Sequence, residues 1–205
     1  MVPLSWERDT RKLFIRLLRG LRMLNFIQSA QTANPQTEDA VSLLLGCHDR
    51  IRHFTQVGMR LAESPQAPAS DRIDAARAVL RYYTVALPLH EADENESVHP
   101  RLRRALPPGE LAHANQQMVE QHAGINASVV ELVPMWQQIE RAPQSQDELG
   151  ERLRLGTERL RTLWSVHLAL EEDQVIPAMR KYLTEEDLTE IAREMQARRQ
   201  PVPSR

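Results

Sequence analysis

Residues 73–94 read IDAARAVLRYYTVALPLHEADE, and the spacing of their apolar side chains sets the fold class that we expect. These side chains recur in alternating steps of three and four residues, which is the spacing of the buried face of a bundle helix. The series is Ile73, Ala76, Leu80, Tyr83, Leu87, His90 and Glu94. The sequence therefore predicts a bundle helix that turns one histidine and one glutamate toward the core.

Three other segments carry the same spacing, and each places a histidine on its apolar face. The series are Leu44, His48, Ile51, Thr55 and Gly58; Leu111, Asn115, Met118, His122, Ile125, Val129 and Leu132; and Leu149, Leu153, Gly156, Leu160, Leu163 and His167, leading to Leu170 or Glu171. Proline and small polar residues interrupt the chain between these segments. Short connections make neighbouring helices run in opposite directions, so we expect an all-α, antiparallel up-and-down four-helix bundle.

The sequence divides into three expected parts. Residues 1–36 form an N-terminal amphipathic helix (5–28) and a linker, residues 37–183 form the bundle, and residues 184–205 form a short C-terminal helix and a disordered tail. The first bundle helix runs to about Glu63 and the C-terminal helix to about Arg198. The expected N-caps are Thr37, then Ser70 or Asp71, and Thr184.

The composition of the chain excludes some classes of binding partner and location. The chain of 205 residues has a net charge of −2, so no bulk basic field attracts nucleic acid. Basic residues interrupt the apolar residues between Leu13 and Leu24, so we expect no signal peptide and no membrane span there. The single cysteine, Cys47, excludes an intrachain disulfide and fits a reducing compartment, which makes a cytoplasmic location the working expectation.

The pair of histidine and glutamate occurs twice. In each copy the glutamate lies four residues after the histidine, and a proline lies ten residues after the same histidine. His48 lies 42 residues before the first copy, and His122 lies 45 residues before the second. The copies, 77 residues apart, are His90, Glu94 and Pro100, and His167, Glu171 and Pro177.

This repeated order predicts a metal centre with two ions. Residues four apart share one face of a helix, and a carboxylate can bridge two cations. A single inward histidine is more often a hydrogen-bonded core residue, but four of them with two equivalent glutamates favour metal. Imidazole and carboxylate ligands suit iron or manganese better than the tetrahedral thiolate sites of zinc. The candidate ligands are His48, His90, Glu94, His122, His167 and Glu171.

Other polar residues near these positions have lesser expected roles. Glu91 and Glu172 lie beside the candidate ligands, so we expect them to face solvent or to support a ligand from outside. Pro88 lies inside the second helix and should bend it beside His90. Surface or loop positions are expected for His53, His99 and His113, and packing roles for Cys47, Trp136 and Trp164.

With these residues in place, the chain resembles the hemerythrin-like HHE cation-binding family over about residues 38–183. The resemblance implies a four-helix bundle that holds a non-haem di-iron centre. In that arrangement Glu94 and Glu171 bridge two irons, and the four histidines are terminal ligands. Oxygen-carrying hemerythrins have a further histidine one turn after the position of His122, where this chain has Asn126. We therefore expect one iron to have an open or water-filled position.

Three functions remain open on this basis. The first is binding or sensing of oxygen, nitric oxide or iron, with the N-terminal helix acting as a relay or forming a homodimer. The second is breakdown of peroxide by the same centre, as in a catalase. The third is a structural interaction bundle that holds zinc or no metal.

Overall fold

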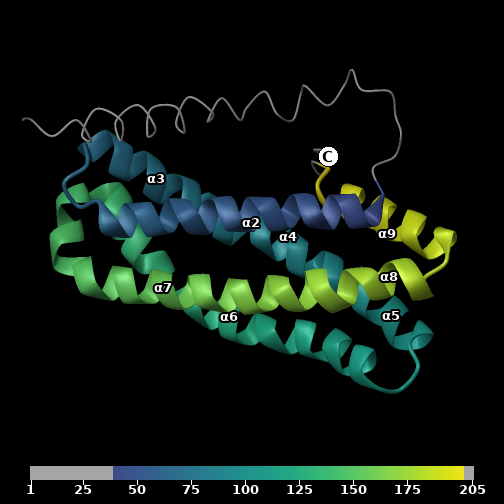
Figure 1. Cartoon of the computed structure of the whole chain (residues 1–205). Helices are drawn as coiled ribbons and strands as arrows, with labels where there is room; N and C mark the ends of the chain where they lie inside the picture. The colour runs from purple at the N-terminus through teal and green to yellow at the C-terminus, as the bar shows by residue number, and fades with distance from the viewer. Residues whose placement is uncertain (1–38, 201–205) are drawn as a thin grey trace, which may run out of the picture. The chain divides into compact units, whose positions relative to one another are not determined.

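The computed structural model describes residues 39–200, and every regular element in that range is helical (Figure 1). The predicted N-terminal helix and the last five residues of the predicted tail lie outside the described residues. Within this range, no helix has both the length and the apolar character needed to cross a membrane. The α-helices are α2 (Ala40–Glu63), α3 (Ala69–Arg81), α4 (Leu87–Ala92), α5 (His99–Ala105), α6 (Glu110–Arg141), α7 (Gln146–Leu170), α8 (Ile176–Tyr182) and α9 (Glu185–Arg198).

Several of these helices join end to end. The π-helical segments η2 (Tyr82–Ala86) and η3 (Asp93–Val98) link α3, α4 and α5, and η5 (Glu171–Val175) links α7 to α8. A short 3-10 turn, η4 (Pro143–Ser145), precedes α7. The long segments pack side by side: α2 contacts α3 and α7, and α6 contacts the same two helices. The predicted helical bundle is therefore confirmed.

The apolar faces predicted from the sequence are buried along most of their length. Glu171 rather than Leu170 completes the fourth face, because Glu171 is buried and Leu170 only partly so. Gly156 allows a close approach of α6 and α7, since a Cβ atom there would lie 3.0 Å from a methyl group of Leu132. The members that are only half-buried are Ile73, Leu111, Gly156 and Leu163.

Two apolar clusters fill the interior, and the inward histidines lie between them. Along α2, His48 follows Leu44 of one cluster and precedes Ile51 of the other. Along α6, His122 lies between the same two clusters. The bundle therefore encloses a polar layer with hydrophobic packing on both sides. The first cluster includes Ile51, Leu80, Ile125 and Leu160, and the second includes Leu44, Val98, Met118 and Met179.

The structure corrects two sequence predictions about which residues cap the N-termini of helices. Asp39, not Thr37, caps α2, because its carboxylate accepts a hydrogen bond of 2.9 Å from the Ser42 amide. The N-cap of α3 is Pro68, so Ser70 and Asp71 lie inside the first turn. Pro68 has φ −49° and ψ 140°, outside the helical region, and no side chain caps the helix there.

The start of α9 matches its prediction. The Thr184 hydroxyl accepts a hydrogen bond of 3.1 Å from the Asp187 amide. The Asp187 carboxylate accepts one of 3.3 Å from the Thr184 amide, which completes a capping box. These two bonds satisfy backbone donors that would otherwise lack partners, so the helix begins where the sequence indicates.

Each π-helical segment ends two residues before a proline, at Pro88, Pro100 and Pro177. A proline inside an α-helix lacks the N–H donor, and its ring clashes with the carbonyl four residues earlier. The wider π turn takes up this conflict, as the Leu87 amide shows by bonding to the Tyr82 carbonyl five residues back. The bend predicted at Pro88 thus takes the form of a π segment. Pro134 is different, because it lies exposed within the uninterrupted helix α6.

Candidate metal centre

All six candidate ligands meet in the polar layer of the bundle. His48 comes from α2, His90 from α4, His122 from α6 and His167 from α7. The glutamates sit on the π segments, Glu94 as the second residue of η3 and Glu171 as the first residue of η5. Every one of the six is at most 4% exposed to solvent. Burial of so many ionisable groups is costly unless they are paired or bind metal.

The six residues form two groups that share both glutamates. Within each group, one ligand atom from each residue lies within 4.8 Å of those of the other members. Sharing of Glu94 and Glu171 is the arrangement that two bridged metal ions require. The groups are His48, His90, Glu94 and Glu171, and His122, His167, Glu94 and Glu171.

Each glutamate turns one oxygen toward each group. Glu94 places Oε1 at 2.9 Å from His90 Nε2 and Oε2 at 2.8 Å from His122 Nε2. Glu171 places Oε2 at 2.9 Å from His48 Nε2 and Oε1 at 3.2 Å from His167 Nε2. Both carboxylates therefore span the space between the two pairs of histidines.

These short contacts are not hydrogen bonds. The Nε2 atoms of all four histidines lack a hydrogen-bond partner, as do both oxygens of Glu94 and Oε1 of Glu171. Nitrogen and oxygen atoms that lie this close without forming a hydrogen bond are typical of ligands directed at a common cation. Two ligands at about 2.1 Å from one ion and at right angles to each other are about 3.0 Å apart. The observed separations of 2.8 to 3.2 Å fit this spacing, so the residues fit a metal.

The two carboxyl groups are perturbed in opposite directions. Burial alone would raise the pKa of both, because it disfavours the charged form. At Glu94 this effect is outweighed by the charge of His90 and the contact with His122, which hold the pKa well below its usual value. At Glu171, burial and the negative charge of Glu94 raise the pKa to about 7. Burial and the other histidines lower the pKa of His167 to about 3, which keeps its imidazole in the neutral, metal-binding form.

Three of the four histidines have a partner for the ring nitrogen that faces away from the centre. Such partners fix the orientation and the tautomer of a metal-binding imidazole. Glu172 is itself bound by Arg52, whose Nη2 lies 2.7 Å from each carboxylate oxygen. Glu172 thus contacts a candidate ligand from the outer side, as expected, whereas the two amide partners follow from no motif. The pairs are His48 Nδ1 with Glu172 Oε1 at 2.8 Å, His122 Nδ1 with Asn95 Oδ1 at 3.2 Å, and His167 Nδ1 with Gln121 Oε1 at 3.1 Å.

His90 has different surroundings. One of its ring nitrogens lies within 4.8 Å of Cys47 Sγ and a carboxylate oxygen of Asp93. Asp93 is fully buried and is bound by Arg198, the last residue of α9, at 3.0 Å and by the following residue, Arg199, at 2.5 Å. A cation there would lie beside two guanidinium groups, so we do not assign a further metal to this cluster. Its effect is to tie α9 to η3.

The remaining polar residues lie outside the centre. Asn126 is exposed, and its amide donates a hydrogen bond of 3.0 Å to Glu91. His53 and His113 are exposed, as expected. The surface or loop position predicted for His99 is wrong. His99 is half-buried in α5, and its Nδ1 lies 3.1 Å from the Asn115 carbonyl oxygen. The packing roles of Cys47, Trp136 and Trp164 are confirmed by their burial.

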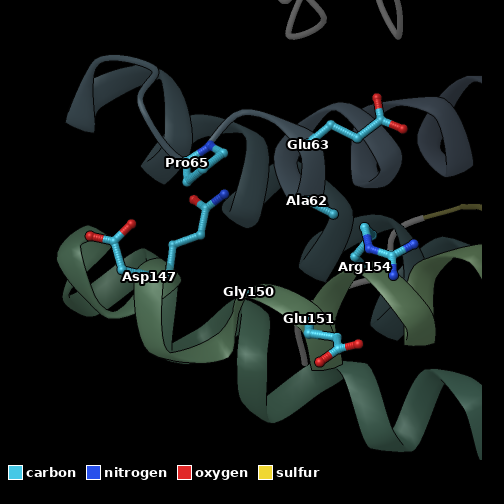
Figure 2. A pocket seen from close by; sticks show the side chains of 8 residues that line it. Ala62, Glu63, Pro65, Asp147, Gly150, Glu151 and Arg154 are labelled. Carbon is cyan, nitrogen blue, oxygen red and sulfur yellow. The ribbon is translucent and has the colours of Figure 1, made fainter.

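A surface pocket of about 650 Å³ lies elsewhere, where the end of α2 meets the start of α7 (Figure 2). At 1.5 Å per residue, Ala62 in this pocket is about 20 Å along α2 from His48. It contains no candidate ligand, and its charged side chains are exposed. The lining residues are Ala62, Glu63, Pro65, Gln146, Asp147, Gly150, Glu151 and Arg154.

Comparison with known proteins agrees with this geometry. A family model of the hemerythrin HHE cation-binding domain matches residues 39–179. An uncharacterized protein of Haemophilus influenzae is 26% identical over 172 residues, which cover 79% of this chain and 91% of the relative. Because the family match covers most of the chain, the chain belongs to the hemerythrin HHE cation-binding domain family.

Proposed function

We propose that the chain is a non-haem di-iron protein in which Glu94 and Glu171 bridge the two ions. The observation that carries this proposal is that each glutamate presents one oxygen to each group of histidines. The layer of orphaned ring nitrogens and carboxylate oxygens supports it, because two cations would satisfy them together. The terminal ligands are His48 and His90 for one ion, and His122 and His167 for the other.

We infer that the centre binds or senses oxygen, nitric oxide or iron. Each group offers four protein ligand atoms, and iron commonly accepts more, so a small molecule has a coordination position. Asn126 supports this, because it bonds to Glu91 outside the centre and adds no ligand. The iron supplies the redox chemistry when bound. The chain itself orients the imidazoles, bridges the ions and excludes water with the apolar clusters on both sides.

The direct test is the optical spectrum of the ferrous protein under anaerobic conditions before and after addition of oxygen or nitric oxide. We expect a new visible absorption in the wild type and in His113→Ala, which removes an exposed histidine of α6. His122→Ala, on the same helix, should lose or alter the new band. A wild-type spectrum that responds to neither gas excludes gas binding at this centre.

Measurements of peroxide breakdown, metal content and stability on the same protein discriminate between the alternative functions. Release of oxygen from hydrogen peroxide that disappears in His90→Ala and His167→Ala would favour a catalase-like enzyme. Purified protein without iron, together with unchanged stability of the Glu94→Ala/Glu171→Ala variant, would favour the structural bundle with zinc or no metal. Manganese in place of iron would keep the centre and change its chemistry.

The wider organisation remains part of the proposal. Helices joined by short links support the antiparallel up-and-down arrangement of four long segments. We propose the division into residues 1–36, 37–183 and 184–205, with a homodimer formed through the N-terminal helix. A cytoplasmic location is proposed from the single cysteine. Sedimentation of the full chain and of a chain without residues 1–36 tests the dimer.

A further inference from the structure

The two groups of candidate ligands differ in the charge of the acceptors behind their histidines, and His90 of the first group has no hydrogen-bond partner at either ring nitrogen. In the first group, His48 Nδ1 lies 2.8 Å from a carboxylate oxygen of Glu172. The second group has only neutral amide oxygens in this place. These are Asn95 Oδ1, 3.2 Å from His122 Nδ1, and Gln121 Oε1, 3.1 Å from His167 Nδ1.

This difference changes how strongly an imidazole donates to a metal. An imidazole that binds metal through Nε2 keeps its proton on Nδ1 and donates it to the outer acceptor. A carboxylate draws on that proton more strongly than an amide oxygen does, because charge-assisted hydrogen bonds are about twice as strong. The ring then carries more electron density at Nε2. His48 is therefore the stronger donor among the three histidines that have an outer partner.

Two other charges bear on this comparison. Arg52 binds the carboxylate of Glu172, but its side chain is 48% exposed, so water screens much of its positive charge. Glu91 carries negative charge on the side of the second group. However, its hydrogen bond is to Asn126 and not to a ligand histidine. Neither charge removes the difference between a direct carboxylate contact and a direct amide contact.

We propose that the two metal positions are unequal, and that the position of His48 and His90 binds the first and tighter ion because Glu172 supports His48. The proposal rests on the dinuclear centre inferred above. Glu172 is in this account a positioning residue, since it acts through His48 and touches no metal. The position of His122 and His167 binds the second, weaker ion.

The test is an anaerobic titration of metal-free protein with cobalt(II), followed by visible absorption in competition with a chelator. The first comparison pairs His48→Ala with His167→Ala, since each removes one imidazole from one position. His167→Ala should keep the tight step of the wild type, and His48→Ala should keep only the weaker step. Equal positions would make the two variants alike, and that result overturns the proposal.

The second comparison changes only the outer partners. Glu172→Gln keeps an oxygen acceptor but removes its charge, so the tight step should weaken about tenfold while the weak step stays unchanged. Gln121→Glu is the reciprocal change and should strengthen the weak step. Circular dichroism of each variant shows that the fold is kept. If Glu172→Gln weakens both steps equally or only the weaker one, the proposal is wrong.

These outcomes separate the inference from the proposed function. A wild-type protein that binds fewer than two cobalt ions contradicts the dinuclear centre itself. A protein that binds two ions with the same response in His48→Ala and His167→Ala keeps the centre and removes only the inequality.

Discussion

Glu94 and Glu171 occupy equivalent positions in the repeat, yet their surroundings give them opposite proton affinities. Glu94 contacts His90 and His122 at 2.9 and 2.8 Å, and these histidines stabilise its charge. Glu171 is equally buried, but it also lies in the negative field of Glu94, and its pKa rises to about 7. Without metal, Glu171 is therefore best accommodated in its protonated form.

Metal-free protein should accordingly lose stability as the pH rises from 5 to 8. In the unfolded chain Glu171 loses its proton near its ordinary pKa, whereas the native state keeps it until about pH 7. The native state thus binds more protons in this window, and raising the pH favours unfolding by at most about 1.4 kcal/mol per unit. The measurement is guanidinium unfolding of the wild type and of Glu171→Gln, which has no proton to lose. The free energy of unfolding of the wild type minus that of the variant should fall with pH; a flat or rising difference contradicts this account.

The inward positions of the candidate ligands were predictable from the sequence, but the outer partners of the histidines mostly were not. Heptad spacing turned His90 and Glu94 inward, because helical periodicity is a local property of the chain. Asn95 and Gln121 each support a histidine on another helix, at 27 and 46 residues distance in the chain. Only the packing of the helices brings such pairs together. Glu172 was easier to anticipate because it directly follows Glu171.

At the level of elements, the prolines of the repeat are linked to its π segments. Pro100 and Pro177 each follow the end of a π segment by two residues, and those segments carry Glu94 and Glu171. The sequence predicted a disturbance at Pro88 from the missing donor. The sequence could not predict a π-helical segment at this proline, because Pro134 lies inside α6 without any π-helical segment. The local outcome depends on the packing around each proline.

The sequence predicted both ends of helix α9, but it did not predict that residues at the end of this helix contact Asp93. Arg198 at its end and Arg199 directly after it reach the buried carboxylate of Asp93, which precedes the candidate ligand Glu94 in the chain. We expect Arg198→Ala/Arg199→Ala to destabilise the metal-free protein by about 3 kcal/mol, because a buried carboxylate is left without a partner. Chemical unfolding measures this loss.

A matched control lies on the same helix. Arg193 pairs with Glu190 at 2.7 Å, and its side chain is 66% exposed. Solvent screens such a pair, so Arg193→Ala should leave the unfolding midpoint unchanged. If both variants lose the same stability, the effect comes from helix α9 in general and not from Asp93.

At the scale of the whole molecule, the buried layer of imidazoles and carboxylates interrupts the hydrophobic core. The two apolar clusters lie on opposite sides of this layer. The buried nitrogen and oxygen atoms between them destabilise the fold unless they have binding partners. Metal that binds only the native state stabilises it through mass action, by about 2.7 kcal/mol at one hundred times Kd. Cobalt(II) should therefore raise the unfolding midpoint of the wild type. The Glu94→Ala/Glu171→Ala variant should show no such rise, and an equal rise in both would place the metal elsewhere.

The stoichiometry of metal binding tests the central claim most directly. Metal-free protein of residues 1–205 is titrated with ferrous iron under anaerobic conditions, and bound iron is determined after removal of the free ion. The account predicts saturation at two ions per chain in the wild type and a loss of bound iron in Glu94→Ala/Glu171→Ala. Saturation at one ion, or the same binding in the variant as in the wild type, would contradict a centre bridged by these two glutamates.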